Sequence, residues 1–344
     1  MNNKLKTQGK KTAILITICI CSLLMILIYL ICYCFSDIKE HTPTINGTKQ
    51  WVEIIGKDKD KPVLLFLHGG PGGASSEDEI CSEMINELKN YYRIVLWDQR
   101  QSGRSYYAEN ENIEITYDLL MKDGEEVTKY ILEKTGANKI TLLGHSWGSC
   151  YAANLAINYP EYYNCFIGTG MLVDVDENEA LFKNEAEKWA TESETMSTLF
   201  NEFQRKDYLS QDYFKAKSKI IHFKFTGNLE QEKNLPVDTK YYKNNRNVPE
   251  GKASSYDNFL LSGEYRLFSL KSKTDFDIPF YILQGENDYQ TMTQLAKEYY
   301  NDINTKTGGF YTIKDKYHSI LTGQTDDIIQ IIEAIYREVY ENSK

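Results

Sequence analysis

The sequence predicts an α/β fold in which a mostly parallel sheet carries helices on both faces. Short apolar runs typical of buried strands alternate with helical patterns along most of the chain. A charged, helix-like stretch at residues 172–275 interrupts this alternation, which indicates a helical cap inserted into the core. An uncharged apolar run near the N-terminus predicts one transmembrane helix before the fold.

Composition and charge narrow the class of protein. The chain has 344 residues, of which 42% are hydrophobic and 26% are charged, as in globular proteins. The formal net charge of −10 gives no electrostatic footprint for nucleic acid, so we expect no nucleic-acid partner. The sequence shows no metal-ligand spacing, and we expect neither a metal nor another cofactor.

The apolar run at residues 13–35 contains no charged side chain. At about 1.5 Å per residue, a helix of that length spans roughly 34 Å, which is enough to cross a bilayer. Lysines and no acids precede the run, so the positive-inside rule predicts that the tail at 1–12 is cytoplasmic and that residues 37–344 are extracellular. We therefore expect a single-pass cell-membrane protein that contacts lipid through residues 13–35.

Two alternatives remain for this run, a cleaved signal peptide and a buried core helix. The run is longer than the usual signal-peptide core of about 7–15 residues, and no small-residue cleavage site follows it. Soluble helices rarely go this long without a polar face.

After the run, residues 37–50 are polar and contain Pro and Gly, which indicates a tether. The first part of the core, 51–171, alternates apolar strand-type runs with amphipathic helical patterns. In chain order we expect strands at 51–55 and 63–68, a helix at 77–90, a strand at 92–97, a helix at 117–134, a strand at 139–143, a helix at 147–159 that Pro160 ends, and a strand at 164–168.

The second part of the core, 276–344, resumes the alternation after the cap. The apolar run FYILQG at 280–285 predicts a strand, and residues 291–303 have a helical pattern. GFYTI at 309–313 predicts another strand. In the last predicted helix, 325–340, apolar residues recur at about 3.6-residue spacing and give the helix one apolar face.

The sequence Gly144-His145-Ser146-Trp147-Gly148 is a G-x-S-x-G motif between a predicted strand and a predicted helix. A nucleophile elbow needs this context, because the tight strand–turn–helix exposes the serine hydroxyl and directs the helix N-terminus at it. Glycine at both flanking positions lets the turn close. The motif predicts Ser146 as a catalytic nucleophile, and the alternative is a glycine-rich turn without chemistry.

A second glycine motif, HGGPGG at 68–73, follows the strand-type run VLLFL. Acyl transfer needs donors aimed at the oxyanion, and a glycine loop after a core strand exposes backbone N–H groups without side chains in the way. We expect this loop to form an oxyanion hole, with His68 fixing the loop rather than acting as a base. The alternative is an ordinary flexible turn.

A serine nucleophile also requires a base and a carboxylate. Four of the five histidines lie in the tether, inside the glycine motifs or in the cap, which leaves His318 as the base. In nucleophile-elbow enzymes the acid lies between the nucleophile and the base in the chain. Asp288, which follows the strand-type run FYILQ, is the first candidate, with Glu286 and Asp315 as alternatives.

Together, HGGPGG, WDQRQSGRS at 97–105 and GHSWGS at 144–149 resemble the proline iminopeptidase group of α/β-hydrolases. The resemblance covers about residues 44–340, and FIGTGMLVDVDENEA and PFYILQGENDYQT are similar to hydrolases near that group. It implies an α/β-hydrolase fold with Ser146 as nucleophile, Asp288 as acid and His318 as base. The implied oxyanion donors are backbone N–H groups, those of Gly70 or Gly69 and of Trp147.

The resemblance further implies a serine hydrolase that works through an acyl-enzyme, foremost an aminopeptidase for short peptides. Gln101 stands where the family pattern D-Q-R-G-x-G-x-S has its first glycine. Near its end the cap has SGEYRLFSL at 262–270 in place of the acidic-aromatic stretch that proline-specific members use for the substrate amine. The alternatives are a carboxylesterase or lactonase with the same triad and a non-catalytic binding domain on this scaffold.

An aminopeptidase must bind a charged N-terminal amine. Burying an ammonium is costly unless carboxylates receive it, and we expect the cap to supply them because the core loops hold the triad and the oxyanion hole. The first stretch of the cap contains six acids, Asp174, Asp176, Glu177, Glu179, Glu185 and Glu187. Glu179 lies in the stretch similar to the hydrolase group, so it is the first candidate for the substrate amine.

Overall fold

The computed structural model describes residues 18, 21, 22, 25, 38–76, 85–229, 255–323 and 325–341. The chain divides into two units, Met1–Lys39 and Glu40–Lys344. In the first unit the described residues of the apolar run are helical, and the rest of 13–35 lies outside the described residues. Within the part of the chain that the structure describes, no helix is long and apolar enough to cross a membrane, so the transmembrane helix stays a prediction.

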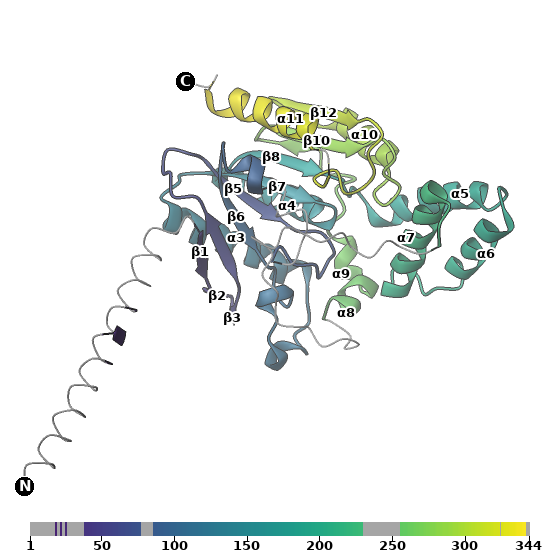
Figure 1. Cartoon of the computed structure of the whole chain (residues 1–344), viewed down its shortest axis with the longest axis horizontal. Coiled ribbons are helices and arrows are strands. Elements are labelled where there is room, and N and C mark those ends of the chain that lie inside the picture. The colour runs from purple at the N-terminus through teal and green to yellow at the C-terminus, as the bar shows by residue number, and fades with distance from the viewer. Residues whose placement is uncertain are drawn as a thin grey trace, which may run out of the picture. The chain divides into compact units, whose positions relative to one another are not determined.

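An eight-stranded sheet runs through the second unit (Figure 1). In spatial order the strands are β1 (Ile38–His41), β4 (Val52–Ile55), β6 (Arg93–Trp97), β5 (Val63–Leu67), β7 (Ile140–His145), β8 (Tyr163–Thr169), β10 (Phe280–Gly285) and β12 (Gly308–Ile313). In this order all neighbouring strands from β6 to β12 pair in parallel, and β4 pairs with β6 antiparallel, which confirms the predicted mostly parallel sheet.

The central strands are buried along their whole length and are mostly apolar, because both faces of the sheet are covered. Every residue of β5, β6, β7 and β10 is buried, as expected for parallel strands between helical layers. In the register, Leu67 pairs with Gly144, and Gly144 pairs with Gly168. The carboxyl ends of β5, β7 and β8 therefore meet at one edge of the sheet, the edge where parallel sheets bind ligands.

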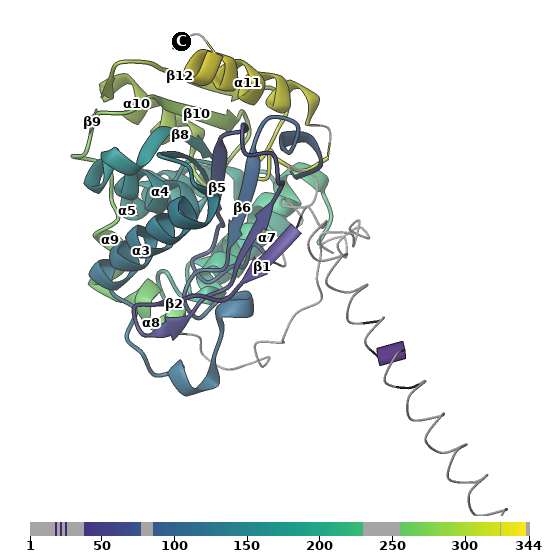
Figure 2. The ribbon, with the colours of Figure 1, turned by 90° about the vertical axis from the view of Figure 1, so that its left-hand side faces the viewer.

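Helices of the core lie close to their predicted positions. They are α3 (Tyr117–Thr135), α4 (Trp147–Asn158), α10 (Thr293–Asp302) and α11 (Asp326–Tyr336). The Thr116 side chain caps the start of α3, and Gly136 ends it in a left-handed conformation. Helix α4 packs on β5, β7 and β8 and also contacts α3 (Figure 2).

The last predicted helix differs in extent from the structure. This helix, predicted at 325–340, is α-helical only to Tyr336 and continues as the π-helical turn η4 (Arg337–Glu341). In this turn the Tyr340 hydroxyl lies 2.6 Å from Thr141 Oγ1 in β7, an anchor that the helical period does not reveal. Of the helix predicted at 77–90, residues 77–84 lie outside the described residues.

Between β8 and β9 (Asp275–Phe276), all the secondary structure in the described residues is helical. These are α5 (Val175–Trp189), α6 (Glu194–Phe203), α7 (Gln211–Thr226), α8 (Ser255–Leu261) and α9 (Gly263–Arg266). Helices α5, α6 and α7 form a group in Figure 1, where α6 contacts both of its neighbours. Phe182 of α5 and Phe203 of α6 meet edge to face, with ring centroids 5.5 Å apart.

Residues 38–49, predicted to lie in a tether, form three strands. Strand β1 belongs to the main sheet, and β2 (Thr44–Ile45) and β3 (Thr48–Lys49) form a hairpin. The hairpin is bonded to α3, because the side-chain amides of Asn46 and Gln50 both donate to the Asp123 carboxylate. The remaining short elements are β9 (Asp275–Phe276), β11 (Asn304–Thr305), η1 (Gly103–Ser105), η2 (Ala108–Asn110) and η3 (Pro160–Tyr162).

Candidate active site

Ser146 lies at the sharp turn between β7 and α4. Its φ of 54° is in the left-handed region, which is rare for a residue other than glycine. A Cβ atom on Gly144 would collide with the carbonyl oxygen of Gly148, and one on Gly148 would collide with that of Leu67. Gly148 is therefore required by the close approach of α4 to β5, and Gly144 by the tight turn from β7 into α4 that carries Ser146 at the carboxyl edge of the sheet.

The glycine loop after β5 runs beside Ser146. A Cβ atom on Gly69 would lie 3.2 Å from the Cβ of Ser146, and Gly70 has a φ of +128° that favours glycine. Gly70 and Trp147 line one cavity together with Ser146. The structure thus brings together the serine and the three residues predicted to supply oxyanion donors.

The His68 side chain contacts the backbone of the glycine loop and of Gln99. It is fully buried, its Nε2 accepts a hydrogen bond from the Gln99 backbone N–H at 3.1 Å, and its Nδ1 lies 2.8 Å from the Gly69 carbonyl oxygen. Burial lowers the pKa of His68 to about 4, so the ring is neutral at pH 7. These contacts fit the predicted structural role.

Gln99 is a positioning residue that the sequence analysis did not single out. Its side-chain oxygen accepts a hydrogen bond from Trp147 Nε1 at 3.1 Å, while its backbone N–H donates to His68. Gln99 therefore ties the glycine loop to the turn that carries Ser146. The signal was present in WDQRQSGRS, where a glutamine comes two residues after the end of the strand-type run at 92–97.

Asp288 and His318 follow neighbouring parallel strands, β10 and β12, and so meet at the same edge as Ser146. His318 Nδ1 lies 2.9 Å from Asp288 Oδ2. The Asp288 carboxylate is buried and also accepts from the backbone N–H groups of Gln290 and Thr291. Those two groups donate to Oδ1, whereas the Gln284 amide and the Thr291 hydroxyl donate to Oδ2, the oxygen that faces His318, at 2.9 and 2.8 Å.

These contacts keep Asp288 ionised. Burial by itself would raise the pKa of the Asp288 carboxyl, but the charge and hydrogen bond of His318 and the hydrogen bonds of Thr291 outweigh it and hold that pKa below its ordinary value. The alternative acids lie elsewhere: the exposed Glu286 side chain accepts from the Asp315 backbone N–H. Of the three candidates, Asp288 is the one bonded to His318.

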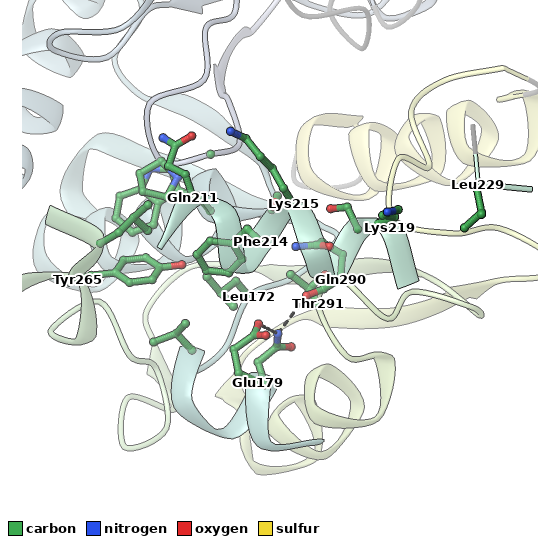
Figure 3. A pocket seen from close by; sticks show the side chains of 18 residues that line it. Leu172, Glu179, Gln211, Phe214, Lys215, Lys219, Leu229, Tyr265, Gln290 and Thr291 are labelled. Carbon is green, nitrogen blue, oxygen red and sulfur yellow. Dashed lines mark hydrogen bonds between the residues drawn. The ribbon is translucent and has the colours of Figure 1, made fainter. Parts of the chain in front are cut away.

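Ser146 lies where two cavities meet. The first, of about 720 Å³, is lined by the loop residue Gly70 and by side chains of α5 and α7 (Figure 3). The second, of about 520 Å³, is lined by His318 and by the aromatic side chains of Phe225, Tyr289 and Tyr317. In the described part of the chain, no three His, Cys, Asp or Glu side chains gather as a metal site would require.

Glu179 lines the first cavity, where Figure 3 shows it near Thr291, but its carboxylate already has partners. Its Oε1 accepts from Lys217 Nζ at 2.5 Å and from the Asn178 amide at 2.8 Å, and its Oε2 accepts from the Tyr213 hydroxyl at 3.0 Å. Glu179 and Lys217 are both buried, so the two charges compensate one another inside the cap. The sequence analysis did not foresee this pairing.

Four other acids of the first cap stretch also have hydrogen-bond or ion-pair partners within the protein. Asp174 caps α5 by accepting from the Glu177 backbone N–H. The remaining ion pairs are Asp176 with Arg266, Glu177 with Lys271, and Glu185 with Lys188.

Comparison with known proteins relates the chain to one family. The family model described as alpha/beta hydrolase fold matches residues 62–321. The probable aminopeptidase YbaC of Bacillus subtilis is 25% identical over 287 residues, which cover 80% of this chain and 89% of that protein. A proline iminopeptidase of Saccharolobus solfataricus is 24% identical over 319 residues, covering 88% and 94%. A solved proline iminopeptidase-related protein of Thermus thermophilus superposes with a TM-score of 0.59 at 19% identity, covering 88% of this chain and 98% of the other.

Proposed function

Because the chain belongs to the alpha/beta hydrolase fold family, we propose that it is a serine hydrolase with Ser146 as nucleophile, His318 as base and Asp288 as acid. One observation carries this proposal. His318, bonded to the buried carboxylate of Asp288, lines the same cavity as Ser146. Nucleophile, base and orienting carboxylate thus lie at one edge of the sheet, as acyl transfer requires.

In the proposed mechanism, His318 Nδ1–H donates to Asp288, which leaves Nε2 to accept the proton of Ser146. As that proton moves, Ser146 Oγ forms a bond to the substrate carbonyl carbon. The backbone N–H groups of Trp147 and of Gly70 or Gly69 donate to the oxyanion. His318 then gives its proton to the leaving group, and a water molecule hydrolyses the acyl-enzyme with His318 again as base.

For the substrate, the relatives named aminopeptidase and proline iminopeptidase support hydrolysis of short peptides with a free N-terminus. Glu179 remains the first candidate for the amine because it lines the cavity that contains Ser146. An incoming ammonium would have to share this carboxylate with Lys217.

That pairing is also the observation that favours the second candidate function, a carboxylesterase or lactonase with the same triad. A carboxylate neutralised by Lys217 offers an ammonium little net attraction, whereas an ester requires no such attraction. The two functions differ in one measurable property, namely whether a free amine on the substrate increases its rate of hydrolysis.

The test compares alanine 4-nitroanilide, its N-acetylated form and 4-nitrophenyl acetate as substrates of the purified full chain. The aminopeptidase predicts a strong preference for the free amine. This preference should be lost in Glu179→Gln/Lys217→Met, which removes both charges of the buried pair together. Equal turnover of free and acetylated anilides, with the ester much faster, would reject the aminopeptidase in favour of the esterase.

We further propose that residues 13–35 anchor the chain in the membrane and that the catalytic domain is extracellular, because this run is uncharged and lysines precede it. Protease added to intact cells should digest residues 37–344. Protection of this region in intact cells but not in lysed cells would reject the orientation. Release of the chain from membranes by carbonate washing would reject the anchor.

A further inference from the structure

The residues that take part in the proposed chemistry are divided between the two cavities. Ser146 lines both of them. Gly70 and Trp147, the proposed oxyanion residues, line the first cavity and are absent from the described lining of the second. His318 lines the second cavity and is absent from the described lining of the first.

This division has a chemical consequence, which rests on the proposed function. In acylation, the base that took the serine proton gives it to the leaving group, so the leaving atom must lie beside the base when its bond to the acyl carbon breaks. The proton moves from His318 Nε2 to that oxygen or nitrogen, and the bond electrons stay with the leaving atom. The acyl carbon remains bonded to Ser146, between the two cavities.

One side of the second cavity is apolar and aromatic, whereas the rest of its lining includes the polar side chains of Ser218, His222, Asn287 and Gln290. Phe225 lies at the C-terminal end of α7, and its ring centroid is 5.6 Å from that of Tyr289 and 4.9 Å from that of Tyr317. Ile221, one turn earlier on α7, continues this wall. Rings at these separations present a surface on which a further apolar or aromatic group would be stabilised by burial and ring contact.

We propose that the second cavity is the leaving-group site, that its aromatic wall selects an alcohol or amine bearing an aromatic or bulky apolar group, and that the first cavity holds the acyl group. Phe225 is then a specificity-determining residue for the leaving group. Phe214, eleven positions earlier on α7 and in the wall of the first cavity, has the corresponding place beside the acyl group.

The test uses benzyl and ethyl esters of one acid, alanine, because the two alcohols differ in size far more than in reactivity. For the full chain, kcat/KM should be about tenfold or more higher for the benzyl ester. Phe225→Ala should bring the benzyl-to-ethyl ratio close to one by lowering kcat/KM for the benzyl ester far more than for the ethyl ester. The matched control, Phe214→Ala, should change both esters by the same factor and keep the ratio.

Deacylation gives a second, independent measurement. Both esters form the same alanyl-enzyme once the alcohol has left, so the hydrolysis rate of this intermediate, followed by intact-protein mass spectrometry, should not depend on which ester was used, either in the unchanged protein or in Phe225→Ala. Tyr317→Ala, at a side chain that is 46% exposed, should lower the ratio in the same direction if Phe225→Ala fails to fold.

The outcomes separate the inference from the proposed function. A ratio of one in the unchanged protein, or a ratio lost in Phe214→Ala but kept in Phe225→Ala, overturns the cavity assignment while Ser146 still acylates. Undiminished ester turnover in Ser146→Ala overturns the serine mechanism, and the cavity assignment falls with it.

Discussion

Lys217 Nζ lies 2.5 Å from Glu179 Oε1, and both side chains are buried in the cap beside the proposed nucleophile. Lys217 also donates to the carbonyl oxygen of Gln290, and Gln290 in turn donates its backbone N–H to Asp288. Burial lowers the pKa of Lys217, and the attraction of Glu179 opposes that shift. The pair therefore connects α5 and α7 of the cap with the loop that carries the proposed acid.

Replacing only one member of the Glu179–Lys217 pair should destabilise the protein more than replacing both members. Glu179→Gln leaves Lys217 buried without a countercharge, which we expect to cost about 3–5 kcal/mol of unfolding free energy. Glu179→Gln/Lys217→Met should recover most of that loss. Urea unfolding of the three proteins measures the effect, and a double variant less stable than Glu179→Gln would contradict the account.

The three proposed triad residues should behave as one unit. Ser146→Ala, His318→Ala and Asp288→Asn should each lower kcat by about 10⁴-fold or more, and the triple variant should lose little beyond the most severe single change. Glu286→Gln serves as the control, since this exposed side chain is bonded to the Asp315 backbone. Near-full activity of Asp288→Asn with a large loss in Glu286→Gln would show that the acid is misassigned.

Stability should fall between pH 6.5 and pH 5 because two histidines are buried as neutral rings. Burial lowers the pKa of His68 to about 4, and burial, followed by the charge of His318, lowers that of His145 to about 3. The unfolded chain, whose histidines titrate near about 6.5, binds more protons than the folded chain in this window. Each ring then contributes stability that is complete above about pH 6.5 and is lost as the pH falls toward its folded pKa.

The expected slope is up to about 1.4 kcal/mol per pH unit for each histidine. Urea unfolding monitored by tryptophan fluorescence at pH 5, 6, 7 and 8 measures it. His68→Gln should reduce the slope between pH 5 and 6.5 by about half. An unchanged slope in that variant would mean that His68 is not buried as a neutral ring.

Gln101, which replaces a glycine of the family pattern, adopts a φ of 57°. Its side-chain amide bonds both backbone groups of Tyr107, accepting from the N–H and donating to the carbonyl oxygen at 3.1 Å each. We expect Gln101→Ala to lose about 1–2 kcal/mol because the left-handed backbone stays and the hydrogen bonds go. Gln101→Gly should be about 1 kcal/mol more stable than the alanine variant, because glycine adopts the left-handed backbone without strain. Equal unfolding midpoints of the two variants would contradict the claim that the side-chain hydrogen bonds of Gln101 offset a backbone cost.

Local patterns were sufficient to predict every strand of the main sheet except β1, which lies in the stretch predicted to be a tether. Apolar runs such as VLLFL and FYILQ mark buried parallel strands, and the glycines around Ser146 mark a turn with no room for Cβ atoms. The order of motifs along the chain also led to His318 and Asp288, which the structure brings together at the ends of β10 and β12.

Contacts across the fold left no local signal. Lys217 and Glu179 lie on different helices, and in the sequence each resembles a solvated surface charge. The hairpin at 44–49 has a polar, turn-rich sequence typical of a linker, but Asp123 of α3 holds Asn46 and Gln50 against the core. Which acid is paired and which is available to a substrate depends on such distant partners.

The central claim is that Ser146 is the nucleophile, and a fluorophosphonate probe followed by peptide mass spectrometry tests it most directly. The account predicts one phosphonylated residue, Ser146, in the purified full chain, with labelling abolished in Ser146→Ala and slowed by orders of magnitude in His318→Ala. Labelling of Ser146→Ala at the unchanged rate, or an adduct on another residue of the unchanged protein, would contradict it.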